Sequence, residues 1–180
     1  MNLSARPKKT VLRTIRISEE LDGILEKDAK VHRTGVNALI SSIMGKYAEW
    51  DRYTEKFEHI AIPTALFRAL LELIDENALA TLADRVSVEL TNEITSFWFK
   101  KIDLETVLQF FSIACEYGKV GEVEIENEGR NYTITVYHEY GRKWSIWLQH
   151  YTDKVIRTVV KAIPQFEATE NTLTLKFQVP

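Results

Sequence analysis

The sequence predicts an α+β protein in which a β-α-α segment precedes a larger domain with the element order ααα-ββ-α-ββ. Three observations lead to this prediction. Residues 11–18 alternate apolar and polar side chains, residues 19–51 carry two stretches with helical spacing, and residues 122–177 contain two pairs of alternating segments. Alternation with a period of two is typical of a half-buried strand, and a period near 3.6 is typical of an amphipathic helix.

The composition bounds the class of protein. Apolar residues make up 45% of the 180 positions and charged residues 27%, which is enough to build a packed core. The single cysteine, Cys115, excludes an internal disulfide and fits a reducing, cytoplasmic location. No stretch approaches 18 uncharged apolar residues, so we expect no contact with a membrane.

The charge is distributed unevenly along the chain. The net charge is −3, yet residues 1–54 carry ten Lys and Arg against seven Asp and Glu, whereas residues 55–180 carry thirteen against nineteen. A basic start on an acidic body suggests a nucleic-acid-binding module joined to a domain with another task. We expect a flexible basic arm over 1–9, a DNA-binding domain over 10–54, a linker over 55–63 and a second domain over 64–180.

The first three elements follow from residues 11–51. Residues 11–17 are expected to form a strand. Ser18 is a good helix N-cap and is followed by two glutamates, so a helix should run from about 19 to 32. Arg33-Thr34-Gly35 breaks this helix, and a clean apolar stripe predicts a second helix over about 36–51.

The second domain has its own sequence of patterns. Helices are expected over 64–76, 79–101 and 104–117, the last of them capped by Asp103. Residues 122–126 and 132–138 alternate on either side of a turn at Glu128-Gly129, which predicts a hairpin. A long helix should then span 141–163, and a final hairpin should pair 165–169 with 172–177.

Residues 11–51 resemble the ribbon-helix-helix family of DNA-binding proteins, the group that includes the Arc, CopG and methionine repressors. The resemblance covers roughly a quarter of the chain. It depends on the alternating strand, the Ser-Glu-Glu helix start, the short polar turn at Arg33-Thr34-Gly35 and the apolar stripe of the second helix. The alternative interpretation is a helical hairpin whose strand belongs to the sheet of the larger domain.

The resemblance implies a homodimer that inserts an antiparallel β-ribbon into the major groove of double-stranded DNA. Because Ile15 and Ile17 would face the helices, three side chains on the other face would read base edges: Leu12, Thr14 and Arg16. Six residues are expected at DNA phosphates: Lys8, Lys9, Arg13, Gly35, Val36 and Asn37. The last three begin the second helix, where free N–H groups can bind an anion. The alternative at this position is a plain turn between helices.

The second domain is rich in aromatic residues between positions 97 and 151. Such residues suit a ligand pocket, an interface or ordinary core packing. The candidate pocket residues are Trp98, Tyr137, Trp144 and Trp147. With Cys115, the histidines at 138 and 150 offer soft metal-ligand atoms, but the spacing matches no metal motif, so we expect no metal and no cofactor.

These features together predict a transcriptional regulator, a repressor by type, with a C-terminal effector-binding or oligomerisation domain. The dimer could assemble further into a tetramer, and a small-molecule effector is a further expected partner. No glycine-rich phosphate loop, His-Glu-x-x-His or Gly-x-Ser-x-Gly is present, so we expect no enzymatic activity. An antitoxin-like protein that binds its own promoter and a partner protein is the alternative.

Overall fold

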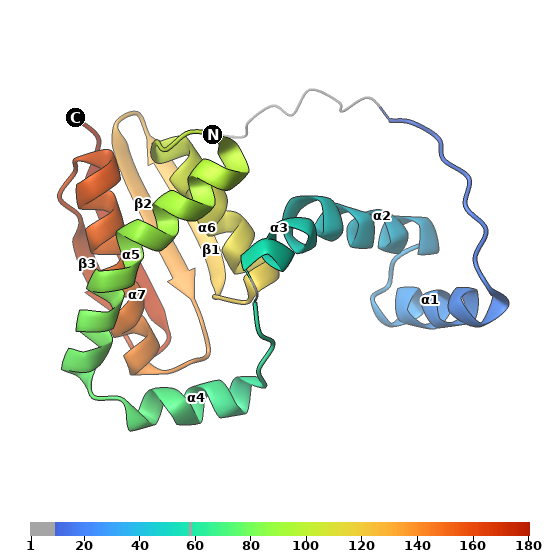
Figure 1. Ribbon diagram of the computed structural model, residues 1–180, viewed down its shortest axis with the longest axis horizontal. Helices are drawn as coiled ribbons and strands as arrows, with labels where there is room; N and C mark the ends of the chain where they lie inside the picture. The colour runs from blue at the N-terminus through green and yellow to red at the C-terminus, as the bar shows by residue number, and fades with distance from the viewer. Residues whose placement is uncertain (1–9, 58) are drawn as a thin grey trace. The chain divides into compact units, whose positions relative to one another are not determined.

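The computed structural model describes residues 10–57 and 59–180. The chain divides into two compact units, Met1–Glu58 and His59–Pro180 (Figure 1). In the part of the chain that the structure describes, no helix combines the length and the apolar character that crossing a bilayer requires.

The N-terminal unit is helical. Helix α1 spans Glu19–Val31 and helix α2 spans Val36–Lys46. The chain then continues through a π-helical turn (Tyr47–Asp51), the short helix α3 (Arg52–Thr54) and a 3₁₀ turn (Glu55–Phe57). The expected N-cap is present, since the backbone N–H of Leu21 donates to the Ser18 Oγ at 3.2 Å.

The prediction of a strand over 11–17, and with it a ribbon-helix-helix fold for this unit, is wrong. Residues 10–18 have no regular secondary structure, and the side chains of residues 11–18 are all exposed on both alternating faces. A strand requires a neighbouring strand for its N–H and C=O groups, and no strand within residues 10–57 and 59–180 pairs with the segment. Alternation alone therefore did not determine a strand, and the sheet of this protein lies wholly in the C-terminal unit.

Helices dominate the first half of the C-terminal unit: α4 (Thr64–Leu73), α5 (Glu76–Phe99) and α6 (Leu104–Gly118). Their starts are set by side-chain caps. The Asp75 carboxylate accepts the N–H of Ala78 at 2.9 Å, which begins α5 earlier than the expected residue 79. Asp103 and Thr106 form a reciprocal capping box at the start of α6, as the sequence indicated for Asp103.

A four-stranded antiparallel sheet completes the unit. Its strands are β1 (Glu122–Glu128), β2 (Asn131–Tyr137), β3 (Gln165–Ala168) and β4 (Thr172–Gln178), in the spatial order β1-β2-β4-β3. Helix α7 (Arg142–Val155), continued by a π-helical turn (Ile156–Val160), connects the two hairpins. The order ααα-ββ-α-ββ is thus present in this unit.

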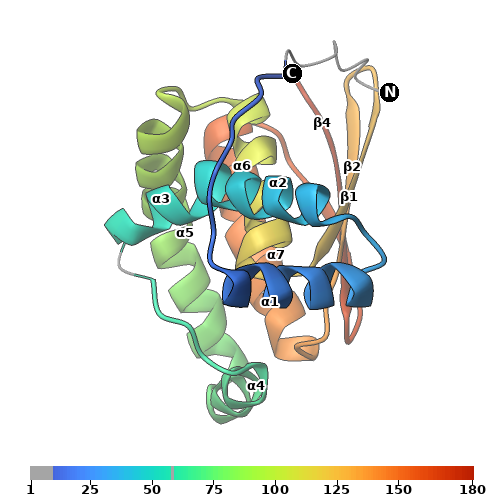
Figure 2. The same cartoon turned by 90° about the vertical axis from the view of Figure 1, so that its right-hand side faces the viewer.

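The core of the unit lies on one face of the sheet. Figure 2 shows the sheet nearly edge-on, with α5, α6 and α7 on the same side. Ile134 and Val136 of β2 and Leu173 and Leu175 of β4 are each at most 2% exposed and face these helices. The other face carries polar side chains, among them Glu122, Glu124 and Glu126 of β1. This division matches the alternation of the strands.

Helix α5 packs closely on α7 through small side chains. Ala83, Ser87, Thr91 and Thr95 recur every four residues and are at most 1% exposed. The hydroxyl groups of Thr91 and Tyr151 lie 2.7 Å apart in this interface. Small residues let the helix axes approach, and the hydrogen bond satisfies both buried hydroxyls.

Candidate functional site

The expected DNA-contacting residues of the N-terminal unit do not lie on a common element. Leu12, Thr14, Arg13 and Arg16 all belong to the irregular segment before α1 and are exposed, with Leu12 at 91%. Lys8 and Lys9 lie outside the described residues. The exposure of these four side chains leaves them accessible to a partner.

The start of α2 has the features of an anion-binding helix end. Gly35 is its N-cap, with φ −86° and ψ 151°, and no side chain caps the first turn. The Gly35 carbonyl accepts the first helical bond, from the N–H of Leu39 at 3.0 Å. Val36 and Asn37 follow at N1 and N2, so their backbone N–H groups point along the helix axis without a side-chain acceptor.

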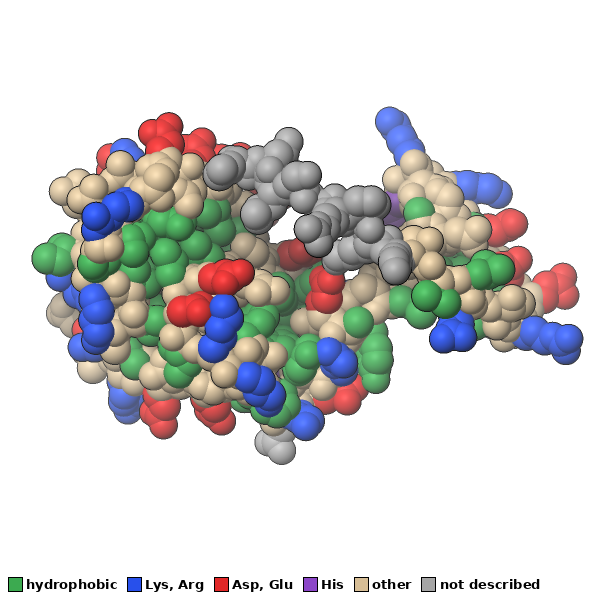
Figure 3. All heavy atoms as spheres, turned by 90° about the horizontal axis from the view of Figure 1, so that it is seen from above, with side chains coloured by type: hydrophobic (Ala, Val, Ile, Leu, Met, Phe, Trp, Pro, Cys, Tyr) green, Lys and Arg blue, Asp and Glu red, His purple; other side chains and the backbone are tan. Residues whose placement is uncertain are grey.

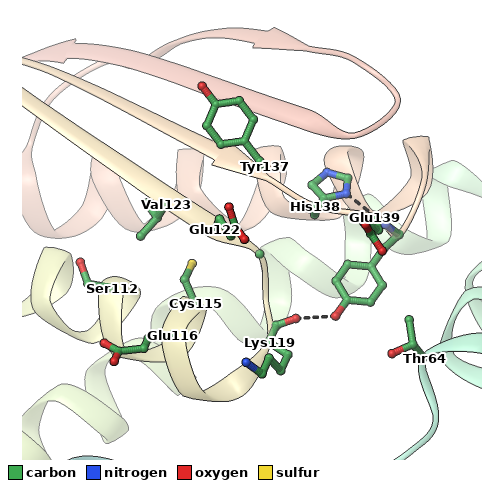
Figure 4. Close-up of a pocket in the computed structure, with 12 residues that line it drawn as sticks. Thr64, Ser112, Cys115, Glu116, Lys119, Glu122, Val123, Tyr137, His138 and Glu139 are labelled. Atoms are coloured by element: carbon green, nitrogen blue, oxygen red, sulfur yellow. Dashed lines mark hydrogen bonds between the residues drawn. The ribbon is translucent and has the colours of Figure 1, made fainter. Parts of the chain in front are cut away.

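A cavity of about 1020 Å³ lies in the C-terminal unit. It is lined by the end of α6, the start of β1, the segment after β2 and the first residue of α4 (Figure 4). Its lining residues are Thr64, Ser112, Cys115, Glu116, Lys119, Gly121, Glu122, Val123, Tyr137, His138, Glu139 and Tyr140. The volume is that of a site for a small molecule.

His138 is held on both sides of its ring at this cavity. Its Nε2 lies 2.9 Å from the buried Ser145 Oγ, and its Nδ1 accepts the backbone N–H of Tyr140 at 3.3 Å. Burial lowers the pKa of His138, while the nearby Glu170 carboxylate acts in the opposite direction. Because Nδ1 accepts, the proton of the neutral imidazole belongs on Nε2, which donates to Ser145.

Tyr140 connects the two sides of the cavity. Its hydroxyl donates to the carbonyl of Lys119, the residue that follows α6 in a left-handed conformation with φ 57° (Figure 4). Burial raises the pKa of Tyr140, so the phenol is a neutral donor. The bond ties the C-terminal end of α6 to the segment after β2.

Gly121 determines how closely the loop between α6 and β1 approaches β2. A Cβ atom on Gly121 would lie 2.5 Å from the Tyr137 carbonyl oxygen and 2.8 Å from Val136 Cγ1. Both atoms belong to a core strand, so neither can move away easily. Only glycine allows the loop from Lys119 to Gly121 to lie against the strand and form this wall of the cavity.

Helix α4 is fixed at the opposite wall. The Lys143 Nζ donates to the carbonyls of Glu72 and Ile74, each at 2.7 Å, and so caps the C-terminal end of α4. The Phe67 ring packs edge-on against Tyr140 and Trp144, with centroid distances of 5.4 and 5.2 Å. These contacts bring Thr64 to the cavity.

The structure separates the four candidate pocket aromatics. Tyr137 lines the cavity, with its hydroxyl donating to Glu124 at 3.2 Å. Trp144 and Trp147, both on α7, stack on each other with their ring centroids 4.6 Å apart. Trp98 lies near the end of α5, against Phe99 and Phe110.

Of the two histidines and the cysteine, only His138 and Cys115 line the cavity. His150 Nδ1 faces Asp84 at 3.6 Å, whereas Cys115 lies at the cavity floor beside β1. Burial raises the pKa of the Cys115 thiol to about 12, so it is neutral. Within residues 10–57 and 59–180, no group of three or more His, Cys, Asp or Glu is placed to hold a metal ion.

Several cavity residues were not singled out by sequence reasoning, among them Glu116, Lys119 and Glu139. The lining residues come from α4, α6, β1 and the segment after β2, and the register of the sheet brings β1 and β2 together beside the end of α6. The glycine after a helix end, at 121, is the one local signal that could have indicated a close approach. No family model matches this chain, and no characterised protein shows a significant sequence match.

Proposed function

We propose that this chain is a transcriptional regulator that binds double-stranded DNA as a homodimer through its N-terminal unit. The observation that supports it most is an apolar surface on a unit with almost no core. Among its described residues only Leu25, Ala29 and Thr54 are buried. The large apolar side chains that remain exposed are Val11, Leu12, Ile15, Ile17, Leu21, Ile24, Val31, Ile43, Met44 and Tyr47.

A second copy of the chain is the proposed cover for this surface. So few buried side chains cannot stabilise a unit of this size by itself, because small units bury too little of their surface. So many exposed apolar side chains on so small a unit are typical of an interaction site. Figure 3 shows hydrophobic side chains at the surface of this unit, interspersed with both basic and acidic side chains. A symmetric dimer would bury the same patch from both copies.

Cationic and anion-binding groups lie on the same unit and support DNA as the ligand. Arg13 and Arg16 are exposed next to the first helix, and the uncapped start of α2 presents N–H groups that suit a phosphate. Residues 1–54 carry a positive balance of charge within an acidic protein. We assign Arg13 and Arg16 to contacts with DNA and the Gly35–Asn37 backbone to a phosphate.

The C-terminal unit is proposed as the regulatory part, either by oligomerisation or by binding an effector in the cytoplasm. It has its own packed core and a cavity of small-molecule size. Footprinting of the full chain on genomic DNA tests the proposal. Discrete protected sites with paired half-sites, and an affinity that falls as salt is added, are expected. The absence of any protected site at low salt would contradict it.

A further inference from the structure

Helix α4 of the C-terminal unit is apolar on two faces. One face packs inside the unit, where Leu71 is 4% exposed and the Phe67 ring lies edge-on against Trp144 of α7. Successive residues of a helix are rotated by about 100°, and this rotation places five exposed side chains on one continuous arc of the remaining surface. All five are apolar: Ala65, Leu66, Ala69, Leu70 and Leu73. This set is called the outward arc of α4 below.

The outward arc is open to solvent within its own unit. Leu73 is 83% exposed, and Leu66 and Leu70 are 48% and 45% exposed. Figure 1 and Figure 2 both draw α4 at the margin of the C-terminal unit, with no other helix or strand of that unit on its outer side. The described part of the C-terminal unit therefore leaves this apolar surface uncovered.

The charged residues of α4 lie beside the outward arc and are engaged within the unit. Helix α4 carries two of them, and Arg68 lies 3.6 Å from Glu139 while Glu72 lies 3.9 Å from Lys143. Residues 55–180 have thirteen Lys and Arg against nineteen Asp and Glu, a net charge of −6, so two copies repel each other over much of their surface. The uncharged arc is a place where two copies can meet without like charges facing each other.

The spacing and the size of the outward side chains suit a second helix of the same kind. Leu66, Ala69 and Leu73 are separated by three and four residues, which is the a/d spacing of paired helices. The small Ala69 side chain lets two helix axes approach, and a leucine on either side fills the remaining space. In an antiparallel pair whose two-fold axis passes Ala69, Leu66 of one copy meets Leu73 of the other.

The available area is sufficient for a specific contact. The three leucines of the arc, together with Ile60 and Ile62 in the segment directly before α4, are between 40% and 83% exposed. At on the order of 100 Å² each, these side chains offer about 500 Å² per copy and about 1,000 Å² in a symmetric pair. Specific protein interfaces begin at about this size.

We propose that α4 is a homodimer interface of the C-terminal unit, formed when the outward arcs of two copies pack antiparallel. The interface gives a definite surface to the oligomerising role proposed above for this unit, on which it rests, and it does not depend on DNA binding. It is separate from the contact proposed for the N-terminal unit. Its test contains no DNA, so either proposal can fail alone.

Sedimentation equilibrium of the full chain tests the interface in the Ile43→Glu variant, which disables the N-terminal contact. This variant should still self-associate. Adding Ala69→Glu places two carboxylates opposite each other at the two-fold axis and should raise the dissociation constant at least tenfold. Ala78→Glu, at an exposed alanine of α5, is the matched control and should leave it unchanged. An Ile43→Glu chain that is monomeric at all concentrations, or equal association with and without Ala69→Glu, would overturn the proposal.

Disulfide formation provides a second test that puts no charge into the interface. Cys115 is 4% exposed, so a thiol introduced at an exposed position is the reactive one. Ala69→Cys should form a disulfide between two folded copies on mild oxidation, because the two-fold axis brings both residues 69 together. Ala78→Cys is the control and should remain unlinked. A yield of linked dimer at position 69 no higher than at position 78 would refute the antiparallel pairing of α4.

Discussion

The Nε2 atom of His138 lies 2.9 Å from the Oγ atom of Ser145, and both side chains are buried. The pair joins the segment after β2 to the first turn of α7. The same segment is held from the other side, because the backbone N–H of His138 donates to the Asn171 carbonyl at 2.9 Å. His138 is therefore a neutral structural group at the edge of the cavity.

This environment predicts a pH dependence of folding. Burial lowers the pKa of His138 below its ordinary value of 6.5. The unfolded chain then takes up a proton at this position more readily than the folded one, so the free energy of unfolding should decrease as the pH falls below about 6.5. Urea denaturation at about pH 7.5 and pH 5.5 measures this change.

The variant His138→Gln lacks the titrating group, so its free energy of unfolding should decrease less over the same pH range. His32→Gln, at an exposed position after α1, serves as the control and should show the same decrease as the wild type. Identical dependence on pH in the wild type and in His138→Gln would show that the imidazole is not held neutral by its surroundings.

Substitution of Gly121 should destabilise the C-terminal unit. The Cβ of Gly121→Ala would overlap the Tyr137 carbonyl and Val136 Cγ1, and we expect a loss of about 1–3 kcal/mol. Gly45→Ala, in α2, is the matched control, since no atom lies within 4 Å of the added methyl group. Denaturation should show the control unchanged or slightly more stable. A Gly121→Ala protein as stable as the wild type would contradict the close approach.

The exposed face of α2 should mediate self-association. Ile43 is 52% exposed, so Ile43→Glu should leave the monomer folded and weaken the dimer at least tenfold. Ser42→Glu adds the same charge to an exposed neighbour on the same helix and should have a smaller effect. Sedimentation equilibrium of the full chain measures both. A wild-type protein that stays monomeric at all concentrations tested would argue against the dimer.

Local patterns predicted most of the C-terminal unit because its elements satisfy their own requirements. Strand β2 alternates between Ile134 and Val136 inside and Thr133 and Thr135 outside, and its partners are in the same chain. Residues 11–17 have a similar alternation, but no strand in the described part of the chain pairs with them. The alternation of apolar and polar residues indicates which side chains can be buried together, whereas strand formation also depends on a second strand.

The candidate site was harder to predict because it arises from register and packing. Cys115 and His138 are 23 positions apart, and only the pairing of β1 with β2 and the docking of α6 place both at one cavity. The aromatic residues of α7 led to the reverse error, because they were expected to line a pocket. Their spacing on α7 indicated one face, but the face is filled by stacking between Trp144 and Trp147.

The binding of DNA by the full chain and by two arginine variants tests the central proposal most directly. Arg16→Ala should weaken binding to a footprinted site by about 1–3 kcal/mol, whereas Arg85→Ala, an exposed arginine on α5, should leave the affinity unchanged. Fluorescence anisotropy at fixed salt gives both values. Equal affinities for wild type and Arg16→Ala, or an equal loss in both variants, would contradict the assignment of DNA binding to the N-terminal unit.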